Sequence, residues 1–143
     1  MKRLTVVLAV SFALSACGSE DGGDDDGLPF EPTLSEIQTN VFDISCVFSS
    51  CHSTQGNKGD LILEPGVSQA NLVGVDVDNP AAAAMSLDRV VAGDASSSFL
   101  MMKLTKPVAT EFGDLMPQGS LDGLSQGKLD AIAQWIDDGA MDD

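Results

Sequence analysis

The sequence predicts a small, mainly α-helical single domain with long loops rich in glycine and proline. Three observations support this fold class. Residues 28–143 have the length of one domain and contain no internal repeat that we can detect. Apolar residues recur at helical spacing near both ends of that segment. Between these ends, glycine and proline interrupt every apolar run, which is typical of loops and short helices.

The first predicted helix covers residues 32–44. Pro32 precedes Thr33-Leu34-Ser35-Glu36, which fits a capping box, where the hydroxyl and the carboxylate satisfy each other's backbone amides. Phe42 flanks the expected buried face. That face consists of Leu34, Ile37, Val41 and Ile44. The helix therefore leads directly into Cys46.

A second clear helix is predicted near the C-terminus. Ser125 suits the N-cap, and Gly139 suits the left-handed position after the last turn. Trp135 flanks the apolar stripe of this helix. The stripe consists of Leu129, Ile132, Ala133 and Ile136.

The middle of the chain gives weaker signals. We expect an extended segment at 59–66, a short helix within 67–75, a helix or small-residue loop at 78–86, a helix within 96–107 and a Gly-rich loop at 111–123. The helix within 96–107 should begin at one of the serines 96–98 and end before Pro107.

Residues 1–16 have the layout of a bacterial lipoprotein signal peptide. Lys2 and Arg3 precede an apolar run over residues 4–14, which is too short for a transmembrane helix. Leu14-Ser15-Ala16-Cys17 resembles the lipobox, which implies that Cys17 is lipidated and becomes the mature N-terminus. We therefore expect a membrane-anchored lipoprotein of the cell envelope that faces the periplasm or the cell surface. Gly18 is compatible with sorting to the outer membrane. The alternative is an ordinary signal peptide with Cys17 free.

Residues 17–27 form the predicted lipidated cysteine and acidic tether, because every residue from 18 to 27 is glycine, serine or acidic. Loss of Lys2 and Arg3 with the signal leaves five basic and 22 acidic residues, so the net charge changes from −15 to −17. This charge argues against nucleic-acid binding and favours protein partners with basic surfaces.

The stretch "ISCVFSSCHST" carries Cys46, Cys51 and the chain's single histidine, His52. A structural zinc site usually needs four ligands, and a nucleophilic cysteine needs a free thiol and a separate base. Two thiols followed by an imidazole are the groups that attach and ligate a c-type haem. The usual spacer has two residues, whereas this chain has four, residues 47–50. Because an extracytoplasmic compartment oxidises thiols, a Cys46–Cys51 disulfide stays open as an alternative.

A second haem ligand is predicted at Met116. Methionine commonly lies opposite histidine in electron-transfer haems. Met116 follows His52 by 64 residues and precedes Pro117, which should stiffen its loop. We expect Met85, Met101 and Met102 to fill the core, with Met101 or Met102 as alternative ligands.

The order of these features resembles the single-haem cytochrome c domain, especially that of bacterial secreted and lipoprotein cytochromes. The matching segments span residues 34–140 and are Ile37-Gln38, Cys46, Cys51-His52, "LILEPG", "NLVGV", "RVVAGDASSSFLMMKL", "LMPQGSLDGLS" and "IAQWIDDGA". The resemblance implies crossed first and last helices around one haem c. It also implies thioether bonds at Cys46 and Cys51, with His52 and Met116 as the axial iron ligands.

By this resemblance the protein is an electron carrier with redox partner proteins, rather than an enzyme. A peroxidase or a dehydrogenase-associated domain is the enzymatic alternative. The non-enzymatic alternative is a haem-free lipoprotein domain that is stapled by a disulfide and has a binding or structural role. The resemblance implies that Arg89 and Trp135 could contact a haem propionate. The alternative is that Arg89 forms a surface ion pair with Asp88 or Asp94 and that Trp135 packs in the core.

Overall fold

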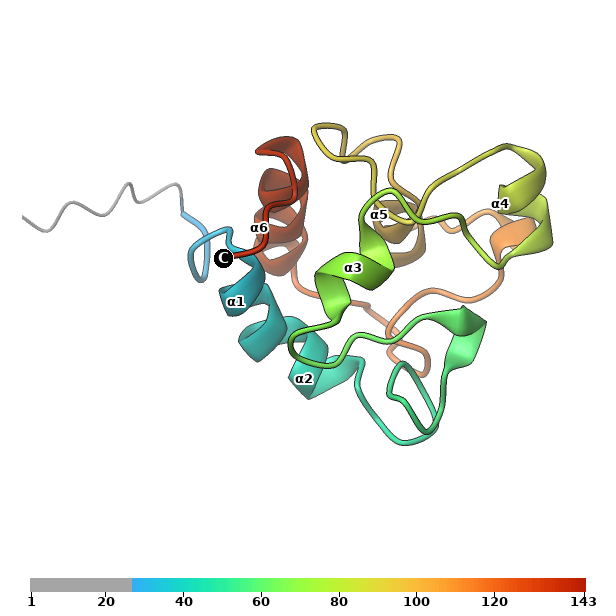
Figure 1. The fold of residues 1–143 in the computed structure, drawn as a ribbon, viewed down its shortest axis with the longest axis horizontal. Helices are drawn as coiled ribbons and strands as arrows, with labels where there is room; N and C mark the ends of the chain where they lie inside the picture. Colours follow the sequence, from blue (N-terminus) through green and yellow to red (C-terminus); the bar gives the residue numbers. More distant parts are fainter. Residues whose placement is uncertain (1–26) are drawn as a thin grey trace, which may run out of the picture.

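A computed structural model describes residues 27–143, which form a small, mainly helical domain (Figure 1). The described residues contain isolated β-bridges but no strand. The predicted signal peptide, Cys17 and nearly all of the tether lie outside the described residues. Within 27–143, no helix has the length and apolarity needed to cross a membrane.

The first helix runs without a break through α1 (Leu34–Ile37), the π-helical turn η1 (Gln38–Phe42) and α2 (Asp43–Ser45). Thr33 caps it, with its hydroxyl accepting from the Glu36 N–H at 3.4 Å. The predicted reciprocal bond is wrong, because the Thr33 N–H donates to the Glu31 carbonyl at 2.8 Å instead. Thus one half of the capping box forms.

The buried face of this helix changes at η1. Ile37 and Val41 are fully buried as predicted, but Ile44 is 60% exposed, so its predicted burial is wrong. A π-helical turn holds more residues than an α-helical turn, and it therefore shifts the residues that follow it around the axis. Phe42, 1% exposed, fills the core instead.

The first helix packs against α6 (Gln126–Asp137), as Figure 1 shows. Lys128 on α6 donates to the Asn40 carbonyl at 2.7 Å. Gly127 lets Pro29, in the segment before the first helix, pack closely on α6, because a Cβ at position 127 would lie 3.0 Å from Pro29. The predicted stripe is confirmed, with Ile132 and Ile136 fully buried and Leu129 and Ala133 half-buried. Contact between the two ends of the domain thus forms one side of the core.

The remaining elements are short, follow the first helix and precede α6 in the sequence, and lie to one side of the packed pair, with α4 farthest from it (Figure 1). They are η2 (Lys58–Asp60), α3 (Ser68–Leu72), α4 (Pro80–Ala84), α5 (Phe99–Leu104) and η3 (Thr110–Phe112). The helices predicted within 67–75 and 96–107 are confirmed as α3 and α5. Residues 78–86 contain a helix, because the Asn79 side chain caps α4 by accepting from Ala81 and Ala82 N–H at 3.0 Å.

Two details of the middle segment differ from expectation. Ser98 holds the N-cap position of α5, but its hydroxyl donates to the Asp94 carbonyl at 2.8 Å rather than capping the helix. Met85 was expected in the core and is 61% exposed, because it ends α4 at the surface.

A buried amide links the first helix to the central loops. Gln38 donates to the Leu63 carbonyl at 2.8 Å and accepts from the Ser68 hydroxyl at 2.7 Å. These bonds satisfy polar groups that burial would otherwise destabilise. They fix residues 61–68 beside the helix that leads to Cys46.

The last residue of the sequence, Asp143, returns to the start of the first helix. Its carboxylate accepts from the Leu34 N–H at 2.7 Å and the Ser35 N–H at 3.2 Å. Burial acts to raise the pKa of Asp143, but hydrogen bonds from Ser35 and Leu34 outweigh it and lower the pKa. The ionised carboxylate therefore stabilises the helix N-terminus.

Replacing Asp143 by alanine should lower the free energy of unfolding by about 0.5 kcal/mol at pH 7, since the group is exposed and screened. Because its folded pKa is lowered, this contribution exists above the unfolded pKa of about 3.9 and disappears as the pH falls through the folded value. Thermal denaturation at pH 7 and pH 2 checks this, with Asp142→Ala as control. An Asp143→Ala effect that is as large at pH 2 would contradict the prediction.

Candidate cofactor-binding site

One large cavity lies in the middle of the domain. Its volume is about 750 Å³, which lies within the range of about 300–1,000 Å³ for small-molecule sites. Apolar side chains from the first helix, α3, α5 and the loops line most of it. The apolar lining includes Val41, Phe42, Leu61, Leu63, Leu72, Val77, Phe99, Leu100, Leu104, Phe112 and Leu124. All four predicted haem-binding residues, Cys46, Cys51, His52 and Met116, also line it.

Cys46 ends the first helix and lies against the core. Its N–H donates to the Phe42 carbonyl at 2.9 Å, and the residue is 9% exposed. Burial, together with the charge of the nearby Cys51, raises the pKa of Cys46 to about 12. The Cys46 side chain is therefore a neutral thiol at pH 7. Cys46 and Cys51 do not form a disulfide in the structure.

The four-residue spacer forms a turn that projects from the domain. The Cys51 N–H donates to the Phe48 carbonyl at 2.8 Å, which closes the turn, and the residues Phe48, Ser49 and Ser50 are exposed. The His52 N–H reaches back to the Cys46 carbonyl at 3.1 Å. This bond brings the two ends of the motif together despite the wider spacer.

Gly56 allows the following loop to pack closely on Cys51. A Cβ at position 56 would lie 2.4 Å from the Cys51 carbonyl oxygen and 2.5 Å from its nitrogen. No side chain fits at that distance unless the backbone moves. Sequence analysis did not single out Gly56, because the need for glycine arises from a contact between two loop segments.

The His52 imidazole is oriented by the extended segment that follows it. Its Nδ1 lies 3.3 Å from the Leu61 carbonyl oxygen, so Nδ1 is the donor in this pair and Nε2 keeps its lone pair. Burial lowers the pKa of His52, while the hydrogen bond to Leu61 acts in the opposite direction. A neutral imidazole with a free Nε2 is the form that binds a metal ion.

Met116 reaches the same cavity from the loop between α5 and α6. Its N–H donates to the Lys103 carbonyl at 2.9 Å, and the side chain packs against the core. Met101 and Met102 belong to α5 and do not line the cavity. Among the methionines of residues 27–143, Met116 is thus the one placed with His52 and the two cysteines.

Positive charge is concentrated at this cavity. Three of the five basic residues after the signal, Lys58, Arg89 and Lys103, line it, together with a single acidic residue, Asp78. Such a lining favours a ligand that combines a large apolar body with anionic groups. No sequence pattern distinguishes these three cations from the other two.

Arg89 is 8% exposed and donates to the Asn71 carbonyl at 2.9 Å and the Gly59 carbonyl at 3.3 Å. The expected surface pairing of Arg89 with an aspartate is wrong, because the side chain turns inward to these carbonyls. Trp135 is a core residue, 2% exposed, that donates to the Met141 carbonyl at 2.9 Å and does not line the cavity.

Within residues 27–143, no group of three or more His, Cys, Asp or Glu side chains is arranged to hold a metal ion by itself. Comparison with known proteins adds no further identification: no protein-family model, curated protein or solved structure matches the chain.

Proposed function

We propose that this protein is an extracytoplasmic, membrane-anchored electron-transfer protein that carries one covalently bound c-type haem. The observation that supports this most is the convergence of four residues on one cavity. Met116 lines the same apolar space as Cys46, Cys51 and His52, although 64 residues separate it from the histidine. The contact between the first helix and α6 is also consistent with the helix arrangement that a cytochrome c-like fold would require.

The residues present fit a haem. The Cys46 and Cys51 thiols would form the thioether bonds. The four residues between them form an exposed turn, so the two additional residues of the spacer do not have to fit inside the cavity. His52 offers Nε2 as the proximal ligand, held by its Nδ1 contact with Leu61. Met116 offers its thioether as the distal ligand. The apolar lining suits the porphyrin body. Among the lining cations, Lys58 suits its carboxylates, since Arg89 and Lys103 donate to backbone carbonyls.

When bound, haem iron supplies one-electron chemistry between the ferric and ferrous states. The chain's own residues determine how that chemistry is used. With His52 and Met116 both held to the iron, no position would remain for a substrate, which favours an electron carrier over a peroxidase. The mostly apolar walls would place the iron in a low-dielectric environment, which favours the less charged, reduced state. A dehydrogenase-associated role would require a catalytic partner.

The proposed location and partners rest on the sequence. Lipidation at Cys17 would attach the protein to a membrane of the cell envelope, and we favour the outer membrane. The mature net charge of −17 favours redox partners with basic docking surfaces and opposes nucleic-acid binding.

The test is an absorption spectrum of protein made in a host with cytochrome c maturation machinery. We expect sharp reduced α and β bands after dithionite treatment and a far-red band in the oxidised protein that reports the methionine ligand. Met116→Ala should abolish the far-red band, whereas Met102→Ala should retain it.

Two results would count against the proposal. A colourless protein, made while a control cytochrome c matures normally, would leave the disulfide-stapled lipoprotein domain as the better account. A far-red band that persists in Met116→Ala and disappears in Met102→Ala would assign the distal ligand to another methionine.

A further inference from the structure

We infer that Lys103 and Lys106 are positioning residues that hold the Met116 loop, residues 110–123, against α5. This inference rests on the proposed function, because its consequence is the retention of Met116 as a ligand. The two lysines lie three residues apart and bind the loop on opposite sides of Met116 in the sequence.

Lys103 binds the loop before Met116. Its Nζ donates to the Phe112 carbonyl at 2.7 Å and also to the Asp114 carbonyl. The Lys103 main-chain carbonyl accepts from the Met116 N–H at 2.9 Å. One residue of α5 therefore contacts the loop at three points, up to and including Met116 itself. Because Lys103 is half-buried and lines the cavity, these bonds are partly shielded from water.

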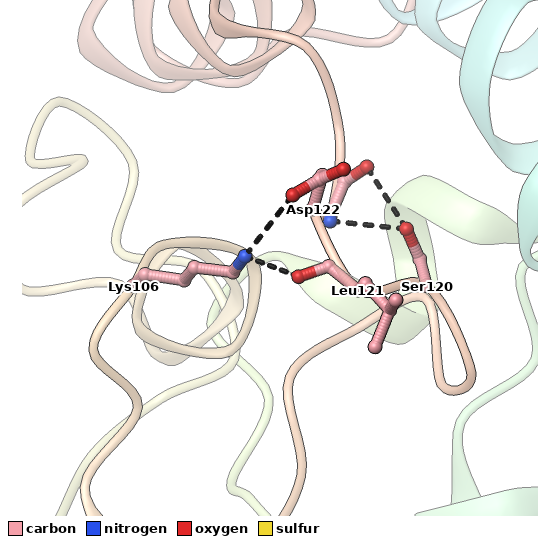
Figure 2. Close-up of polar contacts among 5 residues, drawn as sticks. Lys106, Ser120, Leu121 and Asp122 are labelled. Atoms are coloured by element: carbon pink, nitrogen blue, oxygen red, sulfur yellow. Dashed lines mark hydrogen bonds and ion pairs between the residues drawn. The ribbon is translucent and has the colours of Figure 1, made fainter.

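Lys106 binds the loop after Met116. Figure 2 shows its Nζ pointing at the Leu121 carbonyl, to which it donates, and at the Asp122 carboxylate, 3.9 Å away. The Ser120 hydroxyl closes the same turn by accepting from the Gly123 N–H at 3.0 Å. Lys106 is more exposed than Lys103, with 52% of its side chain accessible. We therefore expect its contribution to be smaller.

This use of lysine stands out against the composition of the protein. The mature chain has five basic residues among 22 acidic ones, yet two of the five bind backbone carbonyls of a single loop. Hydrogen bonds from a charged donor are stronger than those between neutral groups. The loop itself has one short helical turn, η3, and few regular backbone bonds. It consequently depends on side chains from outside for its position.

A matched control is available in Lys128. Its Nζ also donates to a backbone carbonyl, that of Asn40, at 2.7 Å, but it joins α6 to the first helix and does not line the cavity. Lys128→Leu removes the same type of bond without touching the Met116 loop. Comparison with this variant separates an effect on the ligand from a general loss of stability.

The experiment measures the affinity of the oxidised haem protein for imidazole, which binds only when the Met116 sulfur leaves the iron. Lys103→Leu should raise the imidazole affinity about tenfold, equivalent to about 1.4 kcal/mol. Lys106→Leu should raise it about threefold, and Lys128→Leu should change it by less than twofold. Lys103→Arg keeps a charged donor and should remain closer to the wild type than Lys103→Leu.

Hydrogen exchange at the Met116 amide gives a second readout that does not depend on the iron. Exchange should accelerate in Lys103→Leu and Lys106→Leu relative to Lys128→Leu at matched denaturant stability. If Lys103→Leu fails to fold, Lys106→Leu decides the question by both readouts.

The outcomes are distinguishable. If both loop variants match Lys128→Leu in imidazole affinity and amide exchange, the positioning role is wrong and the proposed function stands. If the wild-type protein carries no haem, or Met116→Ala leaves the far-red band intact, the proposed function fails and this inference fails with it.

Discussion

Alanine at both Cys46 and Cys51 is expected to leave no haem that survives denaturation and solvent extraction. Both thiols line the cavity that also holds His52 and Met116, so their loss would remove both proposed attachment points. The double variant should show no haem in a pyridine haemochrome assay of the extracted protein, against one haem per chain in the wild type. This is an all-or-none effect, larger than that of any ligand substitution.

Single substitutions refine this result. Cys46→Ala and Cys51→Ala should each keep one thioether at most and accumulate less haem protein than the wild type. Ser49→Ala serves as the control and should mature normally, because Ser49 is exposed in the spacer turn and does not line the cavity. Covalent haem in the double variant would show that neither cysteine is the anchor.

Alanine at Gly56 is expected to destabilise the protein by about 3 kcal/mol, at the upper end of the cost of overpacking. The added Cβ would lie 2.4 Å from the Cys51 carbonyl oxygen, so the loop or Cys51 itself must shift. Since Cys51 and His52 are adjacent, the shift should also lower the yield of mature haem protein. Guanidinium denaturation of the variant and the wild type measures the change in unfolding free energy.

Gly59→Ala is the matched control for this prediction. Gly59 lies in the same loop with a positive φ of 64°, and a Cβ there would contact nothing within 4 Å. Its replacement should cost about 1–2 kcal/mol through backbone strain and leave haem attachment intact. A Gly56→Ala protein as stable as Gly59→Ala, with a normal haem content, would contradict the role assigned to the close contact at Cys51.

The two terminal helices were predictable because their signals are local. Ser125, Gly139 and the spacing of Ile132 and Ile136 identify α6 without reference to the rest of the chain. The π-helical turn was not predictable, because no residue type in 38–42 specifies it. The misplacement of Ile44 follows from that turn, since helical spacing assumes one constant period.

The candidate site was predictable in part for a different reason. Cys46, Cys51 and His52 form a compact motif, and Met116 is indicated by its position before Pro117 in the loop ahead of the last helix, which the family resemblance then supports. The roles of Gly56, Arg89 and Lys103 depend on backbone atoms of other segments. Every residue has a backbone carbonyl, so the identity of the accepting residue does not indicate such a contact. Composition and spacing therefore do not predict the roles of these three residues.

The most direct test of the central claim is the intact mass of the mature protein under denaturing conditions, after production in a host that matures cytochromes c. We predict a mass higher than that of the processed, lipidated chain by one haem, retained after reduction of any disulfide. A mass that lacks the haem and falls short of the reduced chain by two hydrogens would contradict the claim, because it would show that Cys46 and Cys51 form a disulfide.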